Sequence, residues 1–422
     1  MVINSTVGYF LLCVLLFFVV MYDRNLLVTY HLMGNGNVKY LVVFILLIWG
    51  MALTYLLTVR GRLSFLVFHR PLVLFLLLAS MFFITHELLI GNRLISAKYA
   101  ILLLLLCVSL GVRQNYFFIF KVFGIIGVCL SLIIVLQQIL LLVNENGSLS
   151  SFDIVIHGDE IGRWSACDFV NPYGLGYFER CTIKPINIFG IEYNRSLLFS
   201  REPKYISSVL LVTMASGLVS ESSKKWKLNI LILHLFALLF VMAFTAFASI
   251  ITAFFLLYAR FYAYLFALIA FLLPLIITPL ISKVFPIGFE PSNMIEFRLK
   301  SGLLSLGDGF STKLSLFGTG VTQDLRIIED TILYKIYGQY GVIGFILTAM
   351  LFYFLLKDAF KYNSLHYRDK FVSFGLFIFL TCILFFNLYF FADIFNFYFI
   401  FSAMALLFIP IRKCTIHHKT IL

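Results

Sequence analysis

Charged residues are scarce in this 422-residue chain. Asp, Glu, Lys and Arg make up 12% of it, whereas hydrophobic residues make up 62%. A soluble domain typically carries about 25% charged residues, and a soluble fold could not bury so much apolar surface. A lipid bilayer accepts that surface and requires helices of about 20 apolar residues. The composition therefore excludes an ordinary soluble globular protein and predicts an integral membrane protein.

The chain also lacks metal-binding and secretory motifs. It has no Asp-x-Asp element, and its seven cysteines show no metal-ligand spacing. Only Cys167 and Cys181 share a polar stretch, where they are either two free thiols or, in an oxidising compartment, a disulfide. The apolar run at 1–21 has no basic region before it and no small-residue cleavage site. We therefore expect a retained first helix and not a signal peptide.

Apolar runs between polar connectors predict twelve membrane spans, so that 1–422 forms one integral membrane domain. The tract 228–285 is divided with little help from helix breakers, at Ala246 and Arg260. The predicted spans are 5–22, 40–58, 71–90, 98–112, 116–143, 203–219, 228–244, 246–259, 262–284, 333–356, 371–390 and 393–411.

Cationic residues fix the expected orientation, because short cytoplasmic connectors carry an excess of Lys and Arg. With a cytoplasmic N-terminus, the short outer connectors hold only Arg24, Lys39, Arg93 and Lys98. The net charge of +12 lies in connectors and not on one basic face, so we expect membrane lipids and an anionic substrate as partners, and no nucleic acid. The predicted cytoplasmic residues are Arg60, Arg62, Arg70, Arg113, Lys224, Lys225, Lys227, Arg260, Lys357, Lys361, Arg368, Lys370, Arg412, Lys413 and Lys419.

Two large loops, 144–202 and 285–332, then face outward, and both contain arginines and carboxylates. The first ends in Arg201-Glu202-Pro203, directly before a predicted helix. Pro203 suits a first helical turn and Glu202 suits the positive end of the helix dipole. These residues are therefore either a helix cap with flanking arginines or a site in which Arg195 and Arg201 grip phosphate oxygens through forked donors.

The second loop combines a glycine-rich passage with further charged residues. Arg298 precedes a Phe-Gly-x-Gly element at 317–320, and Arg326 and Asp330 follow it. The next predicted helix contains Gly341 and Gly344, which small-residue helix packing in lipid explains. Packing does not explain the charged residues clustered beside the membrane.

This arrangement resembles the O-antigen polymerase and ligase superfamily, which comprises Wzy-type polymerases and related lipid-linked glycan transferases. The likeness lies in two enlarged outer loops, an Arg and then Glu202-Pro203 at the end of the first, and Arg298 before Phe-Gly-x-Gly in the second. Asp330 then enters a helix with Gly-x-x-Gly. Many relatives place a His where this chain has Asp330, which favours a polymerase over a ligase.

The resemblance implies an all-α polytopic membrane protein of about 12 transmembrane helices, glycosyltransferase C-like, with two large periplasmic loops. It implies metal-independent glycosyl transfer at the periplasmic face of the bacterial inner membrane, with no cofactor. Donor and acceptor would be undecaprenyl-diphosphate-linked glycans, and a chain-length regulator protein is a further expected partner. In this reading Arg195, Arg201, Arg298 and Arg326 bind the diphosphate, Asp330 is the catalytic carboxylate and Glu202 positions the arginines.

Two alternatives remain open. An O-antigen ligase would transfer the glycan onto lipid A core. A flippase or other transporter of lipid-linked oligosaccharide would need charged residues within spans, for which Lys121, His86 and His234 are the candidates.

Overall fold

The computed structural model describes five helices, six strands within the loop predicted at 144–202, and short fragments elsewhere. The continuous ranges are 116–145, 155–157, 167–171, 175–181, 186–188, 191–198, 203–220, 223–258 and 369–385. Fragments are described between 78 and 89, at 316–317 and between 341 and 360. The spans predicted at 5–22, 40–58, 98–112, 262–284 and 393–411 lie outside the described residues.

The five helices coincide with five of the predicted apolar spans. They are α6 (Tyr116–Glu145), α7 (Pro203–Ser220), α8 (Lys224–Val241), α9 (Phe244–Tyr258) and α13 (Lys370–Phe385). In the described part of the chain, one stretch, the 21 residues of Phe123–Val143 in α6, is long and apolar enough to cross a membrane. Shorter apolar stretches are Ile206–Ser220, Thr245–Tyr258 and Lys370–Cys382. That these helices span a membrane stays a prediction.

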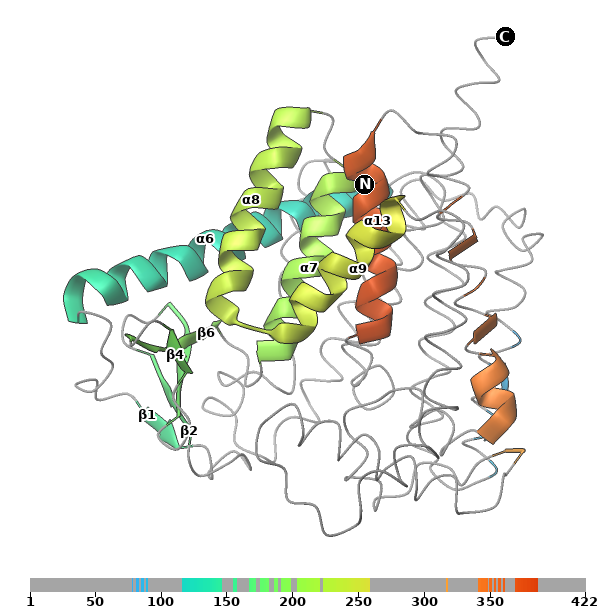
Figure 1. The fold of residues 1–422 in the computed structure, drawn as a ribbon, viewed down its shortest axis with the longest axis horizontal. Coiled ribbons are helices and arrows are strands. Elements are labelled where there is room, and N and C mark those ends of the chain that lie inside the picture. Colours follow the sequence, from blue (N-terminus) through green and yellow to red (C-terminus); the bar gives the residue numbers. More distant parts are fainter. Residues whose placement is uncertain are drawn as a thin grey trace, which may run out of the picture.

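Helix α7 forms the centre of this helix group: it contacts α6, α8, α9 and α13, with α8 and α9 on either side of it and α6 crossing behind α8 and α7 (Figure 1). Its side chains from Val209 to Val219 are buried. Glycines allow the close approach of its neighbours: a Cβ added at Gly124 of α6 would lie 2.8 Å from the Cα of Gly217 in α7. Small residues at such contacts are typical of helices that pack in lipid.

The boundary between α8 and α9 differs from the prediction. The long apolar tract breaks at Met242 and Ala243, before the predicted division at Ala246. Met242 adopts a left-handed conformation with φ 53°, and its N–H donates to the Leu238 carbonyl at 3.0 Å. Neither glycine nor proline marks this turn, and for that reason the pattern of breakers missed it.

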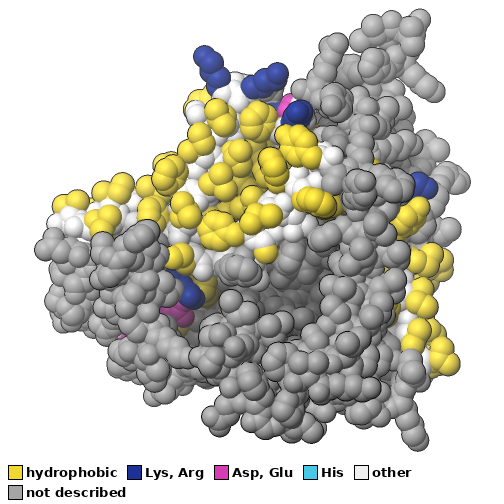
Figure 2. Space-filling model, in the orientation of Figure 1, with side chains coloured by type: hydrophobic (Ala, Val, Ile, Leu, Met, Phe, Trp, Pro, Cys, Tyr) yellow, Lys and Arg dark blue, Asp and Glu magenta, His cyan; other side chains and the backbone are white. Residues whose placement is uncertain are grey.

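The outer helices bury one face and expose apolar side chains on the other. On α6 the buried stripe Leu130, Ile134, Gln137 and Leu141 lies opposite an exposed apolar stripe. Figure 2 shows apolar side chains spread across the described helices, with several Lys and Arg side chains at the top of the view and others at the right and lower left. The exposed apolar residues include Leu132, Leu136, Ile139 and Val143 of α6; Leu228, Ile232, Phe236 and Leu239 of α8; and Ile251, Phe254 and Phe255 of α9.

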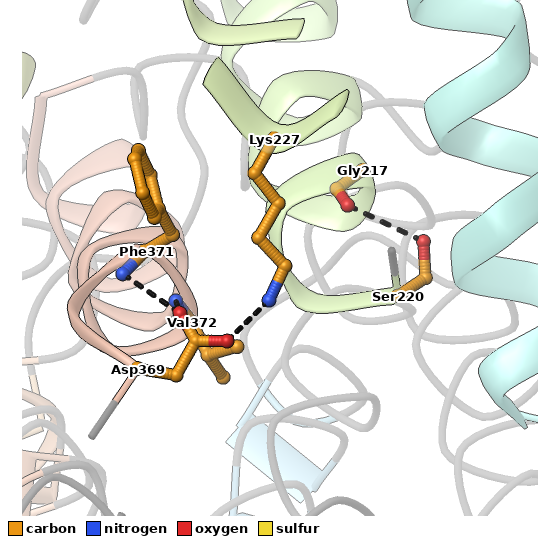
Figure 3. A network of polar contacts seen from close by, with 6 residues as sticks. All are labelled: Gly217, Ser220, Lys227, Asp369, Phe371 and Val372. Atoms are coloured by element: carbon orange, nitrogen blue, oxygen red, sulfur yellow. Dashed lines mark hydrogen bonds and ion pairs between the residues drawn. The ribbon is translucent and has the colours of Figure 1, made fainter. Parts of the chain in front are cut away.

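An ion pair joins the first turn of α8 to the start of α13 (Figure 3). Lys227, only 2% exposed, places Nζ 2.5 Å from Oδ2 of Asp369. The other carboxylate oxygen of Asp369 accepts the backbone N–H groups of Phe371 and Val372 at 3.2 and 3.4 Å. Asp369 therefore caps α13 and neutralises a buried lysine at the same time.

The loop predicted at 144–202 contains β-strands, which were not predicted from the sequence. An antiparallel sheet has the order β1-β2-β3-β6, formed by Val155–His157, Cys167–Val170, Tyr177–Cys181 and Arg195–Leu198. A separate hairpin pairs β4 (Ile186–Ile188) with β5 (Ile191–Tyr193). The sheet directly precedes α7 in the chain, and β6 lies against α6, α7 and α8.

Candidate functional site

Strand β6 gives the loop sheet two chemically different faces. Side chains alternate between the faces of a strand, so Asn194 and Ser196 share one face and Arg195 lies on the other. Ser196 is paired in register with Phe178, and Phe178 with Val170. Phe178 and Val170 form a buried cluster with Leu141 of α6. This face therefore packs on α6 and leaves Arg195 on the opposite face.

Arg195 meets a carboxylate from the neighbouring strand. Arg195 and Glu179 are directly paired in the register of β6 and β3, and the distance from Nη1 to Oε2 is 3.5 Å. A charge-assisted hydrogen bond is usually 2.7–2.9 Å, so this contact is loose. The Arg195 side chain is 31% exposed, that of Glu179 is 9% exposed, and Arg195 Nε is buried without a hydrogen-bond partner.

Electrostatically, this geometry suits a guanidinium that can bind an anion. Glu179 holds Arg195 from one edge, but the long contact does not saturate the forked donors. An arginine keeps its charge at any physiological pH and matches phosphate oxygens with two parallel N–H donors. The arrangement can therefore orient Arg195 in the absence of an anion and release it when an anion arrives.

The end of β6 is strained where the chain leaves the sheet. Leu198 has φ 53°, a left-handed conformation that favours glycine, and its partner strand begins beside Gly176 with φ 143°. A Cβ added at Gly176 would lie 2.8 Å from the Cα of Leu198. The close approach requires glycine at 176, and helix α7 begins at Pro203 as predicted.

Tyr177 closes this corner of the sheet. It is paired with Leu198 and is 5% exposed. Burial raises the pKa of the Tyr177 hydroxyl, and a hydrogen bond with Asn171 opposes that shift. Tyr177 is therefore neutral at physiological pH and contributes packing and polarity, not charge.

Of the six predicted site residues, Arg195 alone lies within the described residues. Arg201 and Glu202 fall between the end of β6 and the start of α7, and their convergence with Arg195 stays a prediction. The same holds for Arg298, Arg326 and Asp330, which lie outside the described residues.

Sequence reasoning missed three residues that contact Arg195 or its two neighbours in the chain. Glu179 was not singled out, because its partner depends on strand register. Gln137 and Gln138 were also missed, although two adjacent amides in the apolar run of α6 are a visible signal: polar side chains within a span are costly and usually have a partner. Their partners are Ser196 of β6 and Asn194, the residue just before β6.

The histidines considered for a transport pathway are packed. His234 of α8 is fully buried; its Nδ1 donates to the Ile230 carbonyl at 2.8 Å. Its Nε2 is close to the space that a Cβ at Gly127 would fill. His86 is 3% exposed, and its Nε2 contacts the carbonyl oxygen of Phe317, in the Phe-Gly-x-Gly element. His234 is therefore packed within the helix group, and His86 links two distant segments of the chain.

Lys121, the third candidate for a transport pathway, is exposed near the start of α6. Within the described ranges, no group of three or more His, Cys, Asp or Glu side chains could hold a metal ion.

Comparisons with protein-family models, with curated proteins and with solved structures found no match to this chain.

Proposed function

We propose that this protein is a membrane-embedded glycosyltransferase that polymerises undecaprenyl-diphosphate-linked repeat units into surface polysaccharide, with Arg195 binding the diphosphate. The observation that carries the proposal is the loose pairing of Arg195 with Glu179 on a sheet held against a long apolar helix. A basic group of this kind beside lipid-facing surface suits an anionic substrate with a lipid tail.

Support for a membrane location comes from the exposed side chains. Leu228, Ile232, Phe236 and Leu239 follow one face of α8 and are 44–54% exposed. Soluble monomers rarely expose such contiguous apolar surface. Lipid contact accounts for it without a further protein partner.

Support for an outward-facing sheet comes from the two ends of α7. The sheet precedes the first residue of α7, whereas Lys224 and Lys225 follow its last turn. The 18 residues of α7 rise about 27 Å, close to the roughly 30 Å of a hydrocarbon core. Exposed Trp226 and Tyr258, with Lys370 5.3 Å from the Tyr258 ring centroid, fit an interface at the lysine end. The positive-inside rule favours that end as cytoplasmic.

In the proposed reaction, a hydroxyl oxygen of the acceptor attacks the anomeric carbon of the donor. The new glycosidic bond forms as the bond from that carbon to the diphosphate oxygen breaks, and the electron pair leaves with the lipid diphosphate. Arg195 stabilises the negative charge that grows on the leaving group. The hydroxyl proton passes to the Asp330 carboxylate, while Glu202 orients the arginines.

Deletion of the gene and complementation with variants test this function in the host that makes the polysaccharide. Gel analysis of surface glycan should show a ladder for the wild type and single-repeat caps for the deletion strain. Arg195→Ala should give the same caps as the deletion, and Arg195→Lys should rescue poorly because it lacks forked donors. Lys225→Ala, at the opposite end of α7, is the matched control and should give a full ladder.

Loss of all attached glycan in the deletion strain would instead indicate a ligase or a flippase. A normal ladder with Arg195→Ala, at wild-type protein level, would remove Arg195 from the site.

A further inference from the structure

Two adjacent glutamines in α6 bind the strand that carries Arg195. The Gln138 amide nitrogen donates to the Asn194 carbonyl at 3.1 Å, and the Ser196 hydroxyl donates to Oε1 of Gln137 at 2.8 Å. Asn194 and Ser196 flank Arg195 in the sequence, so the two contacts hold the chain on both sides of it, through the Asn194 carbonyl and the Ser196 hydroxyl. The side chains of the two glutamines and of their two partners are each at most 7% exposed.

These contacts lie well inside the apolar part of α6. The membrane-compatible stretch runs to Val143, five residues beyond Gln138, which corresponds to about 7 Å along the helix axis. At the same level, Ile139 and Val143 expose apolar side chains on the other face of α6, at 51% and 73%. The strand contacts and the exposed apolar side chains therefore lie at the same level along α6.

A strand at that depth needs partners for its polar groups, because an unsatisfied backbone carbonyl in an apolar region costs several kcal/mol. Gln138 supplies the donor for the Asn194 carbonyl, and Gln137 supplies the acceptor for the Ser196 hydroxyl. Side-chain alternation then turns Arg195 away from α6. The two glutamines therefore explain both how deep the strand lies and which way the arginine faces.

We propose that Gln137 and Gln138 hold strand β6 against α6 below its outer end and so place the Arg195 guanidinium at the boundary between hydrocarbon and headgroups, within reach of lipid phosphate groups, as positioning residues for Arg195. The identity of the ligand, a diphosphate on a lipid tail, rests on the function proposed above. The seat, meaning the attachment of β6 to α6 through Gln137 and Gln138, rests on the contacts themselves. A diphosphate joined to a lipid lies at headgroup depth, so a guanidinium held there meets it without withdrawing the lipid from the bilayer.

The depth of residue 195 tests the seat without requiring enzyme activity. A nitroxide is attached at Arg195→Cys, with the native cysteines replaced, and the protein is placed in lipid nanodiscs. Its accessibility to oxygen and to a water-soluble nickel complex should indicate headgroup depth. In Gln137→Leu/Gln138→Leu the label should move into water. A label that is fully aqueous with both glutamines present, or equally deep without them, would overturn the seat.

Binding of farnesyl diphosphate to the unlabelled protein in nanodiscs tests the positioning role. Gln138→Leu should weaken binding about tenfold, as expected for one hydrogen bond, and Arg195→Ala should weaken it more. Gln138→Leu/Arg195→Ala should bind no more weakly than Arg195→Ala alone, because the glutamine acts through the arginine. Full additivity of the two losses would overturn the positioning role.

The controls separate folding from positioning. Ser131→Ala removes another buried polar group of α6 away from the strand contacts and should leave binding unchanged. Gln137→Leu also removes an amide nitrogen that is buried without a partner, so we expect this variant to fold. If wild-type protein does not bind farnesyl diphosphate at all, the proposed function fails, and the depth measurement still decides the seat.

Discussion

Lys227 and Asp369, 142 residues apart in the sequence, form an ion pair with 2.5 Å between Nζ and Oδ2. The two residues are not equivalent, because Lys227 is 2% exposed and Asp369 is 31% exposed. Removing the Asp369 carboxylate leaves the buried charge of Lys227 without a partner. Removing the lysine leaves a half-buried Asp369 carboxylate that still accepts two backbone N–H groups.

We therefore predict that Asp369→Asn destabilises the protein more than Lys227→Met. The cost should be about 3 kcal/mol for the stranded lysine and about 1 kcal/mol for Lys227→Met. The double variant should recover most of the loss. Thermal unfolding in detergent measures all three variants. Equal effects of the two single variants would show that burial of Lys227 does not govern the pair.

Cys167 and Cys181 are directly opposite each other on the antiparallel strands β2 and β3. Opposed residues in such strands have Cα atoms roughly 4.5–5.5 Å apart, within the range that a disulfide spans. We predict that the two thiols are joined in the oxidising compartment outside the membrane, which would contribute on the order of 3 kcal/mol to the order of the loop. Mass spectrometry after alkylation without reductant checks this. Complete alkylation of both cysteines would exclude the disulfide.

Gly124 of α6 and Gly217 of α7 allow a close backbone contact between the two helices. A Cβ at Gly124 would meet the backbone of Gly217 at 2.8 Å, whereas a Cβ at Gly217 would first meet the flexible Ile230 side chain at 3.2 Å. We predict that Gly124→Ala costs about 1–3 kcal/mol by forcing the helices apart. Gly217→Ala should be nearly neutral, because the gain in helix propensity, about 1 kcal/mol, offsets a small shift of Ile230. Unfolding midpoints that rank the two variants in the opposite order would contradict this packing account.

The helices were predictable from the sequence because a long apolar run and a proline at a first turn are local signals. Accordingly, α7 starts at Pro203, and α6 ends two residues beyond the predicted span. The turn at Met242 was not predictable, since a left-handed methionine leaves no local mark. Pairing of Arg195 with Glu179 depends on strand register and a bulge between Tyr177 and Phe178. This pairing is therefore a tertiary feature that the sequence alone could not predict.

Asp330 is the proposed acceptor-side carboxylate. Many members of the superfamily that the chain resembles have histidine at the corresponding place. We predict that Asp330→Asn abolishes polymer formation, because asparagine keeps the size of the side chain but cannot take the hydroxyl proton. Glu329→Gln is the matched control and should retain a ladder. Glycan gels and immunoblots of membranes measure polymer and protein level. If Asp330→Asn makes normal polymer, the residue only favours the start of a helix, and the base must be sought in Glu202, Glu329 or solvent.

The most direct measurement of the central claim is polymerisation by the purified protein in nanodiscs supplied with lipid-diphosphate-linked repeat units. Elongated glycan and released lipid diphosphate are both quantified. We predict that the wild type releases one lipid diphosphate for each repeat unit that it adds. Arg195→Ala should lower kcat by about 10²–10³-fold, as for loss of one transition-state charge contact. The exchange Glu179→Arg/Arg195→Glu, which keeps a cross-strand pair, should fold and remain inactive. Elongation at the wild-type rate by Arg195→Ala or by the exchanged pair would contradict the account.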